Sequence, residues 1–386
     1  MSDPPVSLRR TPLFDLHRER NGRMVDFAGW NLPVRYDPGP VAEHFHTREA
    51  ASLFDVSHMA VVEVHGASLG DAATALESLV PADVVGLSPG RQRYTMITNA
   101  SGGVVDDLMI AATGDYLTLV LNASRREIDL EVLRSSLEPD GIEVIERSDL
   151  ALLAVQGPEA VRAVAALAPG VEALGFMDIG VFEVAGVDCR VSRSGYTGED
   201  GLELHVPGDE ATAVARALLA GRGGVELAGL AARDSLRLEA GLCLYGNDLD
   251  ETTTPVEAGL TWTIAGRRRS EGGFPGADVV HAQLDDMPPR LRVGFCIDGR
   301  RPVRAGADVA DPTTGDVVGR ITSGGYGPTF GGPIAMGYVP PPLARPDMEL
   351  VAVERGKELS MVVTELPFVT RRYHRPSSAQ IFQEGR

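Results

Sequence analysis

The stretch that most constrains this chain of 386 residues is a predicted β-hairpin whose second strand carries two adjacent carboxylates. Tyr94–Thr98 and Val104–Ala111 are both rich in β-branched and apolar residues, which is typical of strands. The intervening loop, Asn99–Gly103, holds Asn, Ser and two glycines, which accept the left-handed backbone of a hairpin loop. Asp106 and Asp107 therefore lie near the start of the second strand.

A regular strand points successive side chains to opposite faces of its sheet, so Asp106 and Asp107 are expected on different faces. A carboxylate that points into a protein interior needs a hydrogen-bond partner or a chemical role. The residues alone leave two interpretations open. In the first, one aspartate stabilises the turn and the other is solvated; in the second, one of them lines a functional site.

Composition describes a globular protein of more than one domain. Hydrophobic residues make up 44% and charged residues 23% of the chain, which is too long for a single ordinary core. The formal net charge of −18 argues against nucleic acid or an anionic membrane as a partner. Three separated cysteines, no signal-peptide pattern and no long apolar run predict a cytoplasmic protein without a membrane span.

Residues 61–147 show strand and helix signals in the order strand, helix, hairpin, strand, helix, strand, which is typical of a ferredoxin-like α+β module. From Arg292 to Val369, short strands and Gly/Pro turns predict a small all-β domain. The polar run Arg267–Arg269 is expected in an exposed loop, and the tail 376–386 is expected to fray.

Two helix starts are predicted from capping patterns. Thr11 followed by Pro12 predicts a helix with Thr11 as its cap. Ser124–Glu127 has the capping-box pattern and predicts a helix that runs through Leu137.

A glycine-rich loop around Tyr196 precedes another apolar strand. Gly195, Gly198 and Gly201 recur at every third position, a spacing that suits neither a helix nor a strand and indicates a close backbone approach to another group. Glu203 is the polar residue of the strand that follows. Its side chain points either to water or into a site.

Arg233 and Arg237 share one face of a predicted helix because they stand four residues apart. Two guanidinium groups there suit recognition of a carboxylate, and the alternative is a surface pair bound to Asp234 and Glu239. The sequence has no nucleotide-binding glycine pattern, nucleophile elbow or paired C-x-x-C. Carboxylates, a tyrosine-bearing loop and arginines are therefore the available chemistry.

Six motifs, in order along the chain, resemble those of the T-protein family, the aminomethyltransferases of the glycine cleavage system. The resemblance extends over nearly the whole chain, to about Tyr373, and no motif position departs from the pattern. The Arg267–Ser270 segment and the residues after Arg375 look like additions without a family role. The motifs are Thr11–Leu13, Phe54–Met59, Ser101–Leu108, Gly195–Glu199, Ala232–Gly241 and Thr322–Gly325.

The resemblance implies an α+β fold of three domains arranged as a cloverleaf around a central folate channel. The first domain would be split between residues 1–60 and 148–284. Residues 61–147 would form the inserted ferredoxin-like second domain, and residues 285–375 a C-terminal β-barrel or jelly-roll domain.

The resemblance also implies a reaction in which the methylene of an aminomethyl group, carried on the lipoyl arm of H-protein, passes to tetrahydrofolate with release of ammonia. Tetrahydrofolate would be a co-substrate, and neither a metal nor a nucleotide is expected. Two alternatives stay open: a folate-dependent demethylase of a methylated sulfur or oxygen substrate, and a non-catalytic folate-binding protein.

The family pattern assigns Asp106 as the catalytic carboxylate beside the pterin ring, with Asp107 facing away from the channel. It assigns Tyr196 and Glu203 to pterin contacts. The further folate-contacting or lining residues that it implies are Arg233, Tyr373, Met59, Tyr94 and Asn122.

Lipoylated H-protein is the partner that the resemblance implies, and H-proteins are generally acidic. Because this chain also carries a net charge of −18, docking must rely on a local positive patch. The densest such patch near a motif residue consists of Arg371, Arg372, His374 and Arg375, and Arg304 is a weaker candidate.

Overall fold

The computed structural model describes residues 8–221 and 223–375, so the predicted frayed tail 376–386 lies outside the described residues. The chain divides into two compact units. Unit 1 is formed by the described parts of Met1–Ala60, Arg147–Asp234 and Arg372–Arg386, and unit 2 by Val61–Glu146 and Ser235–Arg371. The three-domain boundaries expected from the sequence stay a prediction.

Unit 1 is built on a six-stranded sheet in the order β10-β11-β12-β9-β3-β13. Neighbouring strands are antiparallel except β13, which pairs with β3 in parallel. Both long segments of the unit contribute strands, so the sheet joins residues far apart in sequence. The bounds are β3 Ala51–Asp55, β9 Leu150–Gln156, β10 Ile179–Val184, β11 Val187–Ser192, β12 Gly201–Pro207 and β13 Val225–Leu227.

The core of unit 1 forms where apolar strand residues meet helices α5 and α6. Leu153 of β9 and Leu204 of β12 belong to one buried cluster with Val164 of α5 and Leu218 of α6. β9 is apolar along nearly its whole length because almost all of its side chains are buried. The other elements of this unit are α1 Phe14–Glu19, β1 Arg23–Phe27, β2 Trp30–Arg35, α2 Pro40–Glu49, α5 Ala160–Ala165, η2 Val171–Ala173 and α6 Ala211–Ala220.

The predicted cap of the first helix is wrong. α1 begins at Phe14, and no side chain caps its N-terminus. The Thr11 hydroxyl instead donates a hydrogen bond to Asp55 Oδ2 over 2.6 Å, and His17 Nε2 lies 2.8 Å from the same oxygen. The buried Asp55 carboxylate needs donors, so the Thr11 hydroxyl binds Asp55 instead of capping the short helix.

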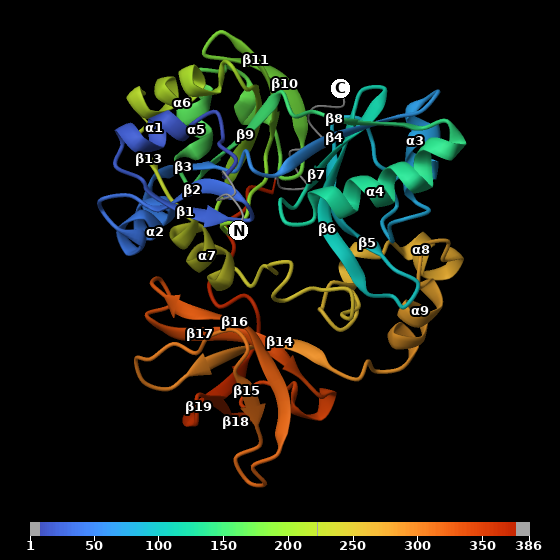
Figure 1. Cartoon of the computed structure of the whole chain (residues 1–386), viewed down its shortest axis with the longest axis vertical. Helices are drawn as coiled ribbons and strands as arrows, with labels where there is room; N and C mark the ends of the chain where they lie inside the picture. Colours follow the sequence, from blue (N-terminus) through green and yellow to red (C-terminus); the bar gives the residue numbers. More distant parts are fainter. Residues whose placement is uncertain (1–7, 222, 376–386) are drawn as a thin grey trace, which may run out of the picture. The chain divides into compact units, whose positions relative to one another are not determined.

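The first part of unit 2 has the predicted ferredoxin-like order. Its sheet runs β5-β6-β7-β4-β8, so the strand–helix–strand units that start at β4 and at β7 interleave, and β5 adds an edge strand. Helix α4 lies across this sheet (Figure 1) and buries Leu130, Leu133 and Leu137. The bounds are β4 Ala60–His65, α3 Leu69–Leu76, β5 Gln92–Thr98, β6 Val104–Thr113, β7 Tyr116–Leu121, α4 Arg126–Leu137, η1 Glu138–Asp140 and β8 Glu143–Glu146.

The predicted hairpin between β5 and β6 is confirmed, and so is the end of α4 at Leu137. The predicted capping box is wrong, because Arg125 occupies the N-cap position and no side chain caps the helix. In the hairpin loop, Gly102 has a φ of +77°, and a Cβ placed on Gly103 would lie 1.8 Å from the Glu251 carbonyl oxygen. This close approach packs the hairpin loop against the chain around Glu251.

The predicted all-β region is confirmed as a closed barrel, β14-β17-β16-β15-β18-β19 (Figure 1, orange and red). Phe295, Ile321 and Ala352, from three different strands, are fully buried in its core. The bounds are β14 Leu291–Ile297, β15 Asp308–Ala310, β16 Val317–Gly327, β17 Gly332–Val339, η4 Pro341–Leu343, β18 Glu349–Glu354 and β19 Lys357–Thr364.

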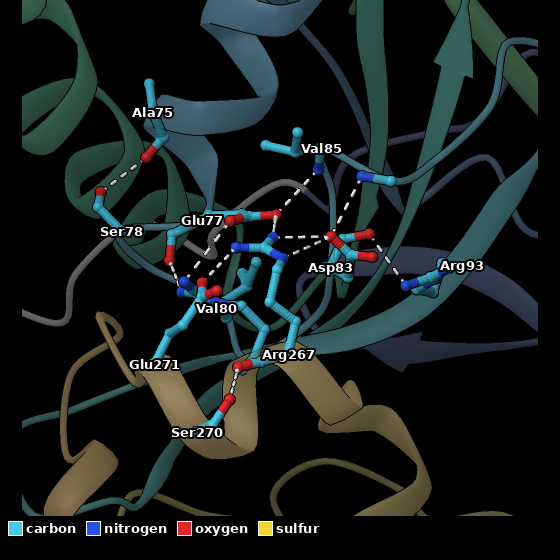
Figure 2. A network of polar contacts seen from close by, with 12 residues as sticks. Ala75, Glu77, Ser78, Val80, Asp83, Val85, Arg93, Arg267, Ser270 and Glu271 are labelled. Atoms are coloured by element: carbon cyan, nitrogen blue, oxygen red, sulfur yellow. Dashed lines mark hydrogen bonds and ion pairs between the residues drawn. The ribbon is translucent and has the colours of Figure 1, made fainter.

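The arginine run expected in an exposed loop forms a helix instead, α8 (Gly266–Glu271). Arg267 donates to Glu77 over 2.5 Å and to Asp83 and Glu271 over 2.7 Å each, as Figure 2 shows. Arg268 is buried and donates to the Glu77 carbonyl. These contacts fix α8 to the end of α3. The remaining elements of unit 2 are η3 Thr261–Thr263 and α9 Ala277–Asp285, while α7 Leu230–Glu239 continues from unit 1 into unit 2.

Candidate functional site

Asn122, at the end of β7, holds the two aspartates of β6. Its backbone N–H donates to Asp106 Oδ2 over 3.1 Å, and its side-chain Nδ2 donates to Asp106 Oδ1 over 3.0 Å. The same Nδ2 donates to Asp107 Oδ1 over 2.9 Å and to the Asp107 carbonyl oxygen over 3.0 Å. One amide therefore orients both carboxylates.

The two carboxylates differ in exposure. Asp106 is 0% exposed, whereas Asp107 is partly exposed and accepts a hydrogen bond from the Tyr94 hydroxyl over 2.9 Å. Trp262 stacks on Tyr94 with ring centroids 5.6 Å apart and remains 61% exposed. This arrangement is the reverse of the expectation that Asp107 faces away and Asp106 is presented to a ligand. Asp107 lies beside an exposed aromatic surface.

Burial, followed by the nearby charge of Asp106, raises the pKa of Asp107 to about 7. Hydrogen bonds from Tyr94 and Asn122 oppose this rise because they favour the charged form. A carboxyl group whose pKa is near neutrality both takes up and returns a proton at physiological pH. Asp107 thus has the properties of a general acid–base group.

Arg233 presents a partly buried cation in unit 1. Its guanidinium carbon lies 4.8 Å from the ring centroid of Tyr196. Burial lowers the pKa of Arg233, and the nearby Glu203 and Tyr196 oppose this shift. Its buried Nη1 has no hydrogen-bond partner among the described residues. Because an unsatisfied buried donor is costly, this nitrogen is suited to bind an oxygen of a ligand.

The glycine-rich loop of unit 1 packs against Gln156, so its predicted close approach is to a side chain. A Cβ at Gly195 would lie 1.8 Å from Gln156 Oε1, and a Cβ at Gly201 would lie 2.5 Å from Nε2. Gln156 Nε2 donates to the Ser194 carbonyl over 2.9 Å. The Ser194 hydroxyl then donates to Glu203 Oε2 over 2.9 Å. The loop therefore fixes the orientation of Glu203.

Tyr373 lies in the C-terminal segment of unit 1. It stacks on Phe176 with ring centroids 4.3 Å apart and an interplanar angle of 15°. The preceding Arg372 forms an ion pair of 2.6 Å with the buried Glu199 and donates its backbone N–H to the Gly198 carbonyl over 2.7 Å. The motif residue Glu199 thus anchors the segment that carries Tyr373.

Met59 is partly exposed and follows the buried His58. Burial, followed by the charge of Arg233, lowers the pKa of His58 to about 4, so its imidazole is neutral at physiological pH. His58 Nδ1 has no hydrogen-bond partner in the part of the chain that the structure describes. Met59 therefore adjoins a buried neutral imidazole whose Nδ1 has no partner among the described residues.

Two family models cover most of the chain. The model described as the GCVT N-terminal domain matches residues 13–268, and the glycine cleavage T-protein C-terminal barrel domain matches residues 290–370. The chain belongs to the glycine cleavage T-protein family.

Relatives of the T-protein family match along almost their whole length. The chain is 47% identical to the mitochondrial aminomethyltransferase of Canis lupus familiaris, over 95% of this chain and 91% of that protein. It is 40% identical to that of Dictyostelium discoideum, over 95% and 94%. The crystal structure of the glycine cleavage system aminomethyltransferase T from Bartonella henselae aligns with a TM-score of 0.89 at 41% identity, over 96% of this chain and 100% of that chain. The predicted family and the α+β fold with a C-terminal barrel are confirmed.

The residues predicted for a T-protein site fall into two groups. In unit 2 the structure brings together Asp106, Asn122 and Tyr94. Asn122 donates to Asp106 and to Asp107, and Tyr94 donates to Asp107. In unit 1, Arg233 lies close to Glu203 and Tyr196. Met59 and Tyr373 also belong to unit 1.

Arg237 of the T-protein motif is a buried residue that stabilises the fold. It is 3% exposed, and its Nη1 donates to Asp248 over 3.0 Å and to Ser323 over 2.9 Å. The interpretation in which it joins Arg233 in recognising a ligand is wrong, because Arg237 is buried and is bound to Asp248 and Ser323.

Sequence reasoning missed four residues of this environment. Trp262 stands outside every quoted motif, and its exposed stacking is visible only in the structure. Gln156 of β9 contacts Ser194, which follows β11, 38 residues further along the chain, so this contact is visible only in the structure. Asp129 gave a usable signal, because it shares the buried face of α4 with Leu130 and Leu133.

Two further properties are negative findings for the described residues. No group of three or more His, Cys, Asp and Glu side chains within 8–221 and 223–375 could hold a metal ion. Over the same ranges, no helix is both long and apolar enough to cross a membrane.

Proposed function

We propose that this protein transfers the methylene group of S-aminomethyl-dihydrolipoyl H-protein to tetrahydrofolate. As a T-protein family member it is an aminomethyltransferase of glycine cleavage, and hence a one-carbon transferase. The methylene carbon gains bonds to two folate nitrogens and loses its bonds to sulfur and to the amine nitrogen. The two protons released from folate pass to ammonia and to the sulfur, so the reaction is balanced without a change of oxidation state.

Asp107 carries the proton transfers in this proposal. Its ionised form accepts a proton from a folate nitrogen and stabilises positive charge that develops at the methylene group. Its protonated form returns that proton to a leaving group. The partly exposed Asp107, with its pKa near 7, suits this cycle better than the fully buried Asp106, and the role of Asp106 is then to hold Asn122.

The unit 1 residues provide recognition in this proposal. Arg233 Nη1 donates to an acceptor oxygen of folate, since this nitrogen has no partner among the described residues. Glu203, held by Ser194, accepts hydrogen bonds from pterin N–H donors. Tyr196, Tyr373 and Met59 supply aromatic or apolar contacts on unit 1. On unit 2, Tyr94 and Trp262 form an exposed aromatic pair beside Asp107.

The environment of Asp107 is the observation that supports the catalytic part of the proposal. This side chain combines partial exposure, fixed hydrogen-bond partners and a pKa near neutrality. A turnover assay with aminomethyl-loaded H-protein and tetrahydrofolate tests it. Release of methylene-tetrahydrofolate and ammonia supports the proposal. Turnover of methyl-thioether or methyl-ether donors instead would favour a demethylase, and binding of folate without any turnover would favour a binding protein.

Lipoylated H-protein is the proposed partner, and the patch of Arg371, Arg372, His374 and Arg375 is its proposed docking surface. These four residues are exposed. Arg372 is already paired with Glu199, so Arg371 and Arg375 are the better candidates for contact with an acidic partner. The proposed compartment is the cytoplasm, which fractionation of the source cells tests.

A further inference from the structure

Asp129 of α4 is a buried carboxyl group close to Asp106, and no N–H or O–H group of the described residues donates to it. It is 0% exposed on the sheet-facing side of α4. Neither of its carboxyl oxygens accepts a hydrogen bond from any N–H or O–H group of the described residues. Its carboxyl group lies in hydrogen-bonding contact with that of Asp106, which is also 0% exposed. Two adjacent buried carboxylates cannot both be ionised at an acceptable cost.

Asp106 is the partner that keeps the charge. It accepts two hydrogen bonds from Asn122, and donors to a carboxylate favour its ionised form. Asp129 lacks such donors, so the proton of the pair resides on Asp129. A protonated Asp129 donates to Asp106 and leaves one negative charge on the pair.

We infer that Asp129 is a positioning residue that stays protonated and, through Asp106 and Asn122, sets the orientation and proton affinity of Asp107. The hydrogen bond from Asp129 fixes the rotamer of Asp106. Asp106 then fixes the Asn122 amide, whose Nδ2 also donates to Asp107 Oδ1. The inference deepens the proposed function and rests on it where it concerns Asp107.

The electrostatic surroundings agree with this assignment. Burial, then the charge of Asp106, raises the pKa of Asp129 to about 10, while Arg125 at the start of α4 opposes the rise and Asp107 adds to it. The other titratable groups that face the three aspartates are Tyr94 on β5, and Cys243 and Tyr245 from the segment beyond α7. Glu251 lies one step further out and pairs with Arg125. Asp129 therefore keeps its proton under conditions in which Asp107 has lost its own.

The protonation state is testable without turnover. At about pH 8.5, where Asp107 is ionised, the infrared absorption spectrum of the full chain should show the C=O stretch of a buried protonated carboxyl group. The band should vanish in Asp129→Asn and persist in Asp107→Asn. Absence of the band from the unmodified protein, or its persistence in Asp129→Asn, would overturn the inference whatever the enzyme does.

The positioning role has its own pair of variants. Asp129→Asn keeps a donor toward Asp106, so turnover should stay within about twofold and the pH profile of kcat/KM should be unchanged. Asp129→Leu removes the donor, and we expect at least about tenfold loss of kcat with a displaced acid limb of the profile. Melting temperatures of both variants show whether each is folded. An unshifted pH profile in folded Asp129→Leu, or loss of activity in folded Asp129→Asn, would contradict the role.

Discussion

Asn122 donates to two neighbouring carboxylates, and this sharing makes the Asp106–Asp107 pair unequal. Asp106 takes the backbone N–H and lies in the interior, while Asp107 shares the side-chain amide and receives the Tyr94 hydroxyl near solvent. A pair of adjacent aspartates in a sequence predicts opposite faces but does not show which face is accessible. That depends on α4 and on Trp262, which belong to other parts of the chain.

The raised pKa of Asp107 predicts a pH dependence of both stability and activity. The folded chain binds more protons at this site than the unfolded chain between about pH 4 and pH 7, so this contribution to stability is present at low pH and is lost as pH rises to about 7. Asp107→Asn should remove this pH dependence, because the amide stays neutral at every pH. Melting temperatures of both proteins across this range should therefore converge at the acid end, with the variant the more stable at pH 8.

The same titration should appear in turnover. Because the ionised form accepts the proton, kcat/KM of the unmodified enzyme should fall as pH drops below about 7. A profile that is flat between about pH 5 and pH 8 would contradict the role given to Asp107.

The unpartnered Arg233 nitrogen predicts a loss of folate affinity on substitution. Arg233→Leu removes the donor, so we expect the Kd of reduced folate to rise at least about tenfold, as for the loss of one charged hydrogen bond. The exposed Arg162→Leu on α5 is the matched control and should bind as the unmodified protein does. Calorimetric titration measures both, and equal affinity in Arg233→Leu would remove this residue from the site.

At the scale of elements, the strands around the site were predictable and some of their details were not. β5, β6 and β7 stand out because short apolar, β-branched runs alternate with turn residues. The register shift between Ile97 and Thr98, opposite the start of β6, carries no such signal, because a bulge depends on the partner strand.

Helix α8 was missed for a different reason. Its sequence, Gly266–Glu271, has no apolar periodicity from which a helix could be predicted. Ion pairs from Arg267 to the distant residues Glu77 and Asp83 hold this helix in place. The prediction that Thr11 caps α1 is wrong because the Thr11 hydroxyl donates to the buried Asp55 instead. In each case a tertiary partner overrode a local pattern.

The Arg267 network predicts a measurable contribution of α8 to stability. Arg267→Ala removes contacts to Glu77, Asp83 and Glu271 (Figure 2) and should lower the free energy of unfolding by about 1 kcal/mol, the upper range for an exposed ion-pair network. Arg134→Ala breaks one exposed pair on α4 and should cost less than about half of that. Urea titrations decide, and equal losses would mean that the network adds nothing beyond a single pair.

At the scale of the whole molecule, the acidic charge of −18 makes association with an acidic partner dependent on local patches. Charge reversal of Arg371 and Arg375 together should slow association with H-protein and weaken its salt dependence, while folate affinity stays unchanged. Arg345→Glu, an exposed change on the barrel side of the same chain, is the control. Stopped-flow association at several salt concentrations provides the readout. Equal rates in the double variant and the control would place the docking surface elsewhere.

The central claim is that the chain transfers a methylene group to folate through one accessible carboxylate. It is tested most directly by single-turnover measurements with aminomethyl-loaded H-protein and tetrahydrofolate, for the unmodified enzyme, Asp107→Asn and Asp106→Asn. We predict methylene-tetrahydrofolate and ammonia in equal amounts, a loss of at least about 10²-fold in Asp107→Asn at unchanged folate affinity, and a smaller loss in Asp106→Asn. Full activity of Asp107→Asn, with activity abolished in a folded Asp106→Asn, would contradict the account.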